Sequence, residues 1–310
     1  MAAIHHSTVA VRGLRFPVVA SGPPEGRAVL FLHGFPQTSL SWRHQMDAVA
    51  EAGHRGVAFD QRGYSSGARP PRVEDYRTDE LVADVIALAD ELDLERFDLV
   101  GHDWGAMVAW VTAARHPGRL RTLTAVSVPH PMAFAAAFGG TAPAPGAPGA
   151  SSAPPAGDDG GGDEDQRQRS AYIEVFRAEG GVAERALVGA DGSGDGLRAM
   201  FDASGLPSSS EEATAFVAAM LEPGAMTAAL NWYRAADPGA LGDVGAVTVP
   251  TLYVWSDNDV ALGRRAAEDT VNWVSGPYRF EVLAGVSHWI PETAPDALNG
   301  LLLEHLAAHP

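Results

Sequence analysis

The sequence Gly101-His102-Asp103-Trp104-Gly105 decides the fold class of this chain. It directly follows an apolar run, residues 97–100, and it opens a helix-period stretch, residues 106–116. A strand that enters a helix between two such glycines makes a sharp turn, which lifts the central side chain out of the sheet. Asp103 holds that central position, where the helix dipole favours an anion and keeps its pKa low. The pattern predicts a carboxylate nucleophile on a strand-to-helix turn.

The simplest alternative role for Asp103 is that of an N-cap, because Asp is common just before a helix. The sequence His33-Gly34-Phe35-Pro36 argues against that role, since it directly follows another apolar run, residues 28–32. Where a nucleophile stands on such a strand-to-helix turn, the loop after a neighbouring strand supplies one backbone N–H of an oxyanion hole. The residue after the nucleophile supplies the second N–H. We therefore expect the N–H groups of Phe35 and Trp104 to form an oxyanion hole.

Two further candidates lie near the C-terminal end. Asp259 follows the run 251–255, and His288 follows the run 279–283. In the order nucleophile, acid, histidine, His288 would be the general base and Asp259 would accept its other ring N–H. Asp257 is the competing acid, but Asp259 lies further into the loop, where a side chain can reach His288. The spacing of His and acidic residues suggests no metal site, and we expect no cofactor.

Short runs rich in Val, Leu and Phe alternate with helix-period segments along most of the chain. Such runs are typical of strands buried on both faces, and their alternation with helices predicts an α/β fold with a mainly parallel sheet between helices. The predicted strands are residues 7–11 and 16–20 (an initial hairpin), 28–32, 56–59, 97–100, 120–128, 251–255 and 279–283, and the predicted helices are 39–51, 78–92, 106–116, 263–274 and 295–308.

The alternation stops after Pro129 and resumes at Val249, with only helical segments and loops between. We interpret residues 131–245 as a helical cap inserted into a core of residues 1–130 and 246–310. Within the cap, residues 139–165 are rich in Gly, Ala, Pro and acidic residues and lack Val, Leu, Ile and Phe. Because such a segment buries little apolar surface, we expect a disordered surface loop.

The composition excludes several classes of partner. The formal net charge of −17 disfavours nucleic acid and anionic membrane surfaces. The absence of cysteine excludes disulfides and thiolate sites. The longest apolar stretch, residues 106–114, is about half of what a membrane-spanning helix needs. The N-terminus has no signal-peptide pattern, and we expect a cytoplasmic protein.

These motifs resemble those of the α/β-hydrolase-fold epoxide hydrolases. The resemblance implies an α/β-hydrolase fold with an inserted helical cap, a small hydrophobic epoxide and water as substrates, and two ring-opening tyrosines in the cap. Tyr233 matches one of the two, and Tyr172, in a segment with a one-residue insertion, resembles the other. The matching segments are His33-Gly34-Phe35-Pro36 through Trp42-Arg43-His44-Gln45, Asp60-Gln61-Arg62-Gly63-Tyr64, the Asp103 motif, Asn231-Trp232-Tyr233-Arg234 and the stretch from Tyr172 to Glu184.

The leaving group distinguishes the functions open to a carboxylate nucleophile. Asp103 is ionised at neutral pH, so it can attack an sp³ carbon and form an alkyl ester that His288-activated water cleaves. An epoxide oxygen leaves as an alkoxide and needs a proton donor, which Tyr233 and Tyr172 would supply. Phe35 and Trp104 would line the substrate site.

Two alternatives stay open: a haloalkane or haloacetate dehalogenase that uses the same Asp103, His288 and Asp259, and a ligand-binding protein without turnover. A haloalkane dehalogenase could hold its halide on Trp104, but Phe35 stands where the second donor of that family is often Asn. Haloacetate dehalogenases typically carry Arg after the nucleophile and one turn later, where this chain has Trp104 and Met107 or Val108. A ligand-binding protein without turnover usually lacks a member of the catalytic set, and all members are present here.

Overall fold

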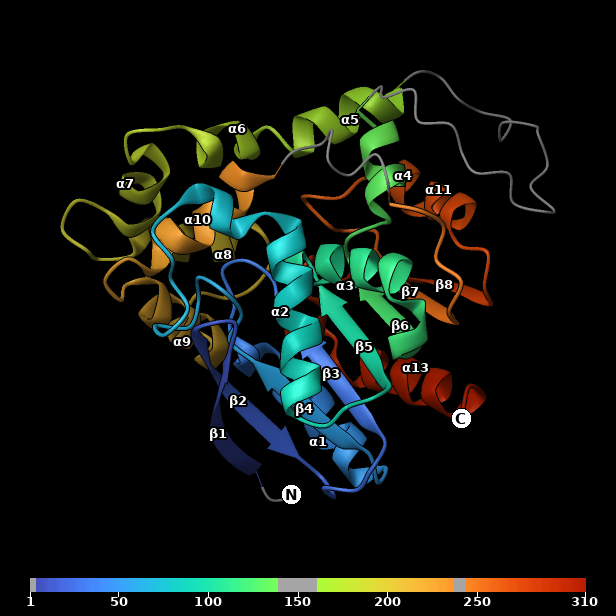
Figure 1. Cartoon of the computed structure of the whole chain (residues 1–310). Coiled ribbons are helices and arrows are strands. Elements are labelled where there is room, and N and C mark those ends of the chain that lie inside the picture. Colours follow the sequence, from blue (N-terminus) through green and yellow to red (C-terminus); the bar gives the residue numbers. More distant parts are fainter. Residues whose placement is uncertain (1–3, 139–160, 237–243) are drawn as a thin grey trace.

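An eight-stranded sheet forms the centre of the computed structural model, which describes residues 4–138, 161–236 and 244–310. The strand order is β1-β2-β4-β3-β5-β6-β7-β8. The pairs β1–β2 and β2–β4 are antiparallel and all other pairs are parallel, which confirms the predicted α/β class (Figure 1). The strands are β1 (Ile4–Val11), β2 (Leu14–Ser21), β3 (Ala28–Leu32), β4 (Arg55–Phe59), β5 (Phe97–His102), β6 (Leu120–Val126), β7 (Thr251–Ser256) and β8 (Tyr278–Leu283).

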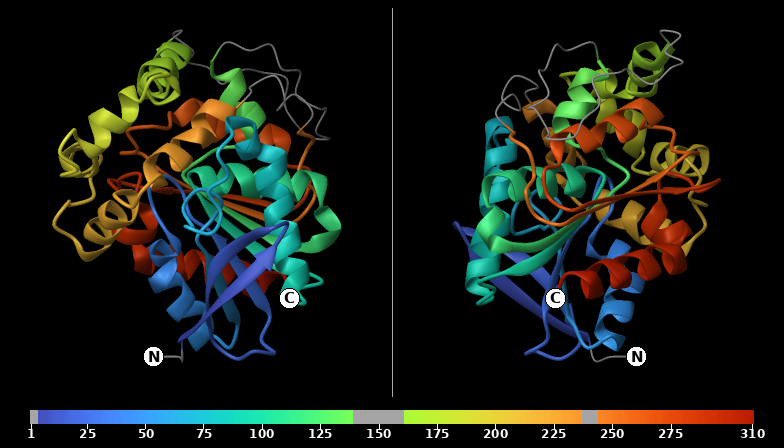
Figure 2. Two further views of the ribbon diagram at one scale, coloured as in Figure 1. Left: turned by 60° about the vertical axis from the view of Figure 1, so that its left-hand side comes forward. Right: turned by 90° about the vertical axis from the view of Figure 1, so that its right-hand side faces the viewer.

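The central strand β3 illustrates why the core strands are apolar throughout. All five of its residues are buried, and successive side chains point to opposite faces of the sheet. Val29 and Phe31 join the apolar cluster under one helix layer, while Leu30 and Leu32 join the cluster under the other. Helices α1 (Arg43–Glu51) and α13 (Pro295–Ala308) cover the first face, and α2 (Thr78–Glu91) and α3 (Trp104–Arg115) cover the second (Figure 2).

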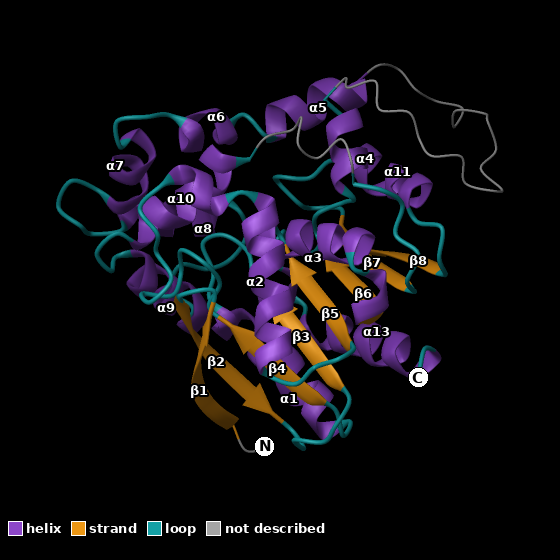
Figure 3. Cartoon of the chain, viewed as in Figure 1, coloured by secondary structure: helices purple, strands orange, loops and turns teal. Residues whose placement is uncertain are grey.

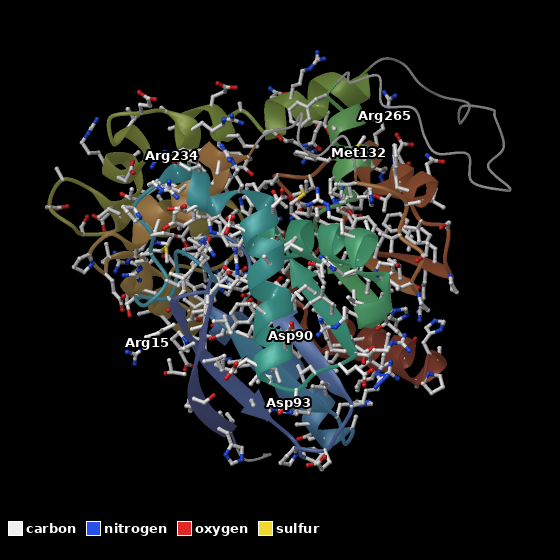
Figure 4. The ribbon with its side chains drawn as sticks, in the orientation of Figure 1. Arg15, Asp90, Asp93, Met132, Arg234 and Arg265 are labelled. Carbon is white, nitrogen blue, oxygen red and sulfur yellow. The ribbon has the colours of Figure 1, made fainter. Side chains whose placement is uncertain are left out.

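The described residues between β6 and β7 form helices and loops without a strand (Figure 3). In Figure 1 these helices lie beyond the end of the sheet toward which the arrowheads of β5 and β6 point. Figure 4 labels Met132 on α4 and Arg265 on α11 (Arg264–Asp269), two helices that pack together. The inserted helices are α4 (Pro131–Ala136), α5 (Gly161–Arg169), α6 (Tyr172–Arg177), α7 (Val182–Val188), α8 (Asp195–Ala203), α9 (Glu211–Met220) and α10 (Ala225–Ala235).

Several predicted boundaries are wrong for identifiable reasons. Strand β6 ends at Val126 because Ser127 has a positive φ of 67°, which breaks the extended backbone. The segment 39–51 begins with a 3₁₀ turn (Ser39–Trp42) before α1. The predicted loop 139–165 is too long, since α5 begins at Gly161 and polar contacts hold that helix in place. The rest of the predicted loop, residues 139–160, lies outside the described residues.

Among the described helices, none alone has the length and apolar character of a membrane span, and only the bent pair of α9 and α10 meets those criteria jointly.

Candidate active site

Asp103 lies on the turn between β5 and α3, with φ 51° and ψ −122°. A positive φ is uncommon for a residue other than glycine, so the surroundings must hold this turn in place. Gly105 is required nearby, because a Cβ atom there would lie 2.1 Å from the carbonyl oxygen of Leu32. Although Asp103 occupies the N-cap position, its side chain makes no capping hydrogen bond. The alternative role as an N-cap is therefore wrong, and the carboxylate is directed elsewhere.

The carboxylate of Asp103 binds the loop after β3. The N–H of Phe35 donates to Oδ1 of Asp103 at 2.8 Å. Trp104 begins α3, so its N–H is one of the helix-terminal donors without an intrahelical acceptor. Both predicted oxyanion-hole residues thus adjoin Asp103, and one of the two amides already holds a carboxylate oxygen.

His288 lies between two carboxylates. Its Nδ1 is 2.7 Å from Oδ2 of Asp259, and its Nε2 is 3.5 Å from Oδ2 of Asp103, the outer limit of a hydrogen bond. Asp259 is fully buried on the loop after β7, where its Oδ1 accepts hydrogen bonds from the N–H groups of Ala261 and Leu262. The competing acid, Asp257, instead accepts a hydrogen bond from the N–H of Gly285 and is exposed. The structure therefore brings Asp259, and not Asp257, to the histidine.

The protonation of these groups follows from their burial and charges. Burial alone would raise the pKa of Asp103, but the hydrogen bond and charge of His288 and the Phe35 N–H lower it below its usual range. Burial alone would lower the pKa of His288, but the carboxylates of Asp259 and Asp103 outweigh burial and raise that pKa to about 10. The free site thus favours an imidazolium between two carboxylates.

An aromatic cluster from the inserted helices covers this site. Tyr233 of α10 is buried, and its ring packs edge-on against Phe35 at 5.3 Å and Trp104 at 5.0 Å between centroids. Tyr172 of α6 lies next to it, with ring centroids 6.3 Å apart. Burial, and the nearby charge of Asp103, raise the pKa of both hydroxyls, which therefore stay protonated. All seven predicted site residues come together here, from the loop after β3, the turn after β5, α3, α6, α10 and the loops after β7 and β8.

Two side chains outside the predicted site residues hold the backbone of His288. The ring of His102 lies with Nε2 2.9 Å from the carbonyl oxygen of His288 and Nδ1 2.9 Å from Oε1 of Gln37. The hydroxyl of Ser127 donates to the same carbonyl at 3.0 Å. Burial and the adjacent charge of His288 lower the pKa of His102 to about 4, so its ring is neutral. Proximity to Asp103 in the motif was the only sequence signal for His102, and Ser127 carried none.

Tyr64 and Glu292 are two further buried groups near the site. The hydroxyl of Tyr64 has no hydrogen-bond partner among the described residues, and its ring packs edge-on against His33 at 4.6 Å. Glu292 accepts hydrogen bonds from Gln37 and Ser41 at 2.6 Å each, and burial raises its pKa to about 7. Within the described ranges, no cluster of His and acidic side chains could hold a metal ion.

The fold and site together give an α/β scaffold with a buried carboxylate on a strand-to-helix turn, and comparison with known proteins identifies the family. A family model described as "alpha/beta hydrolase fold" matches residues 27–143. The chain is 32% identical to the AB hydrolase superfamily protein YfhM of Bacillus subtilis over 301 residues, covering 96% of both chains. It is 32% identical to Epoxide hydrolase A of Mycobacterium tuberculosis over 315 residues, again covering 96% of each.

A solved structure shows the same similarity. The crystal structure of Epoxide Hydrolase A from Mycobacterium thermoresistibile aligns with a TM-score of 0.78 and 28% identity, over 98% of both chains. This chain belongs to the α/β-hydrolase-fold epoxide hydrolase family.

Proposed function

We propose that this protein is an epoxide hydrolase, which opens an epoxide to a vicinal diol through a covalent alkyl ester on Asp103. The observation that carries the proposal is the pair of protonated tyrosines, Tyr233 and Tyr172, that faces the same site as the carboxylate. A carboxylate alone fits several leaving groups, but a hydroxyl pair fits an oxygen that leaves as an alkoxide. The names of the relatives support the same substrate class.

We also propose that residues 131–245 act as a cap domain over a core of residues 1–130 and 246–310. The support is that both tyrosines lie on helices of the insertion, whereas Asp103, Asp259 and His288 lie on the core. A substrate between the two parts would be enclosed by aromatic rings. Such an apolar site suits a small hydrophobic epoxide.

Ring opening would begin at Oδ2 of Asp103, because Oδ1 is engaged by the N–H of Phe35. Oδ2 forms a bond to one epoxide carbon, and the bond between that carbon and the ring oxygen breaks. The resulting alkoxide takes a proton from the tyrosine pair, which solvent later replaces. Ester formation removes the charge of Asp103, which is one of the causes that raise the pKa of Tyr233 and Tyr172. Both hydroxyls therefore become better proton donors when the alkoxide needs a proton.

Ester hydrolysis would use the other half of the site. Ester formation removes the charge of Asp103, one of the causes that raise the pKa of His288, and the imidazolium then loses a proton to solvent. The neutral ring of His288 takes a proton from water, and the water oxygen bonds to the carboxyl carbon of Asp103. Oδ1 becomes an oxyanion held by the N–H groups of Phe35 and Trp104, and the loss of one such donor costs about 10²–10³ in rate. The bond from the carboxyl carbon to the alkyl oxygen then breaks, and the diol takes the proton from His288. Asp259 stabilises the imidazolium that forms.

The test is a paired turnover screen with the purified protein. Styrene oxide and aliphatic epoxides are assayed for diol, beside bromoalkanes and fluoroacetate assayed for halide release. We expect diol from the parent, a strong loss with Tyr233→Phe, and no change with the matched variant Tyr278→Phe, which removes a buried hydroxyl on β8 away from the site. Halide without diol would instead support a dehalogenase and reduce both tyrosines to packing residues. Neither product would favour a binding protein without turnover.

A further inference from the structure

Helix α5 binds the loop that carries Asp259 through two polar side chains. Gln166 is 1% exposed; its Nε2 donates to the carbonyl of Ala261 at 2.9 Å, and its Oε1 accepts from the N–H of Gly263 at 2.7 Å. Arg169 donates from Nη1 to the backbone carbonyl of Asp259 at 2.5 Å. One helix of the insertion therefore holds three backbone groups within residues 259–263.

The backbone held by Gln166 is the same backbone that binds the Asp259 carboxylate. The carbonyl of Ala261 and the N–H of Leu262 are the two ends of one peptide group. Gln166 donates to the carbonyl end, and the N–H end donates to Oδ1 of Asp259 at 3.0 Å. Hydrogen bonds in such a chain polarise one another, so the bond from Gln166 strengthens Leu262 as a donor to the carboxylate. The other carboxylate oxygen, Oδ2, contacts His288 at 2.7 Å.

The local sequence suits this contact. A Cβ atom on Gly263 would lie 3.0 Å from Oδ2 of Asp165 and 3.2 Å from Oε1 of Gln166, so a glycine permits the close approach. Both N–H groups of the Gln166 amide are used, because Nε2 also donates to the hydroxyl of Ser170 at 2.8 Å. Arg169 forms an ion pair with Asp165, with its Nε 2.8 Å from Oδ2 of Asp165. The contact is therefore built from polar groups whose hydrogen bonds are satisfied, in a helix with little apolar surface to hold it otherwise.

We propose that Gln166, supported by Arg169, is a positioning residue for Asp259. It fixes the peptide group that binds the carboxylate, and so sets the direction of the Asp259–His288 hydrogen bond during ester hydrolysis. This inference rests on the proposed function only in that it needs an ester on Asp103, from an epoxide or from any other alkylating substrate. Through Gln166 the inserted helices would act on the general base, His288, in addition to supplying the tyrosines that protonate the leaving oxygen.

The test compares Gln166→Ala with Gln168→Ala, a matched change at an exposed glutamine of the same helix. Single-turnover mass spectrometry follows the formation and the decay of the ester on Asp103. We expect Gln166→Ala to slow the decay roughly 10- to 100-fold, as a small misplacement of a catalytic group does, and to change formation by less than about twofold. Gln168→Ala should match the parent in both steps. An unchanged decay rate in Gln166→Ala would overturn the proposal.

A second readout needs no substrate. The Nδ1 proton of His288, assigned by its loss in His288→Gln, should give a far-downfield proton NMR signal in the parent that shifts or broadens in Gln166→Ala and not in Gln168→Ala. This readout distinguishes failure of the positioning role from failure of the epoxide assignment. If Gln166→Ala does not fold, Gln166→Glu keeps the side-chain volume and the acceptor for Gly263 but removes the donor to Ala261. It should slow ester decay as well, and a parent-like decay rate would overturn the proposal.

Discussion

Replacing Asp103 by Asn should lower the pKa of His288 by about three units. The substitution keeps the shape of the side chain and removes its charge, so it imitates the neutral ester, and we expect it to abolish turnover. In the parent, the carboxylates of Asp259 and Asp103 oppose the effect of burial and raise the pKa of His288 to about 10. The variant retains only Asp259. The same change accompanies ester formation, which would release His288 to act as a base after the first step.

The magnitude follows from one distance. Nε2 of His288 lies 3.5 Å from Oδ2 of Asp103. At an effective dielectric constant of about 20, unit charges at that separation attract by about 4–5 kcal/mol. Since about 1.4 kcal/mol corresponds to one pKa unit, the loss of this charge lowers the pKa by about three units. The pKa of His288 in Asp103→Asn should then lie near 7.

The assay is an NMR titration of the imidazole signals, assigned with His288→Gln. Asp257→Asn is the matched control, because it removes an exposed carboxylate from the loop that also carries Asp259. The Asp257 carboxylate accepts a hydrogen bond from the N–H of Gly285 and does not contact His288. We expect the parent pKa in the control. A titration midpoint in Asp103→Asn within one unit of the parent would refute the reasoning, because the two groups would then not be coupled.

Three further outcomes follow from the same geometry. Tyr233→Phe should slow ester formation by about 10²-fold, as the loss of a general acid does, and leave ester decay almost unchanged in the same single-turnover experiment; equal slowing of both steps would contradict its role as a proton donor. His288→Gln should accumulate an adduct with the mass of the variant plus the substrate, because ester formation needs no base; intact-mass spectra without an adduct on a substrate that the parent turns over would contradict the assignment. Glu292→Gln should stabilise the protein at pH 8 more than at pH 5. Burial raises the pKa of this carboxyl from 4.5 to about 7, so the unfolded chain ionises first and the free energy of unfolding falls as pH rises from about 4.5 to 7. The expected gain at pH 8 is of the order of 3 kcal/mol, measured by urea unfolding beside the exposed control Glu95→Gln, and equal stability of parent and variant at both pH values would contradict it.

Local patterns were enough to predict the sheet and the turn at Asp103. The run that forms β3 is buried on both faces, so its composition alone marks it as a central strand. The turn needs small residues at fixed offsets, and Gly105 has contacts that exclude any side chain. Such requirements lie within a few residues of sequence, which is why they can be read without a structure.

Contacts between distant segments could not be predicted in this way. Asp257 and Asp259 follow the same strand, and only the loop that returns near Gly285 decides which of them reaches His288. The polar composition before Arg169 predicted a loop through residue 165, but Gln166 bonds to Ala261, 95 positions later, and such contacts hold α5 against the core. The partners of Glu292 lie more than 250 positions away. The composition of a segment indicates how much apolar surface it can bury. It does not indicate whether polar contacts with distant residues hold the segment in a regular structure.

The covalent ester on Asp103 is tested most directly by a single turnover in H₂¹⁸O with the enzyme in excess over an epoxide that it opens. In the proposed reaction, the water oxygen bonds to the carboxyl carbon of Asp103 and the diol receives both of its oxygens from the epoxide and the old carboxylate. We therefore predict ¹⁸O in the peptide that contains Asp103 and none in the diol from the first turnover. Label in the diol with an unlabelled Asp103 peptide would contradict the account, because water would then have attacked the epoxide directly.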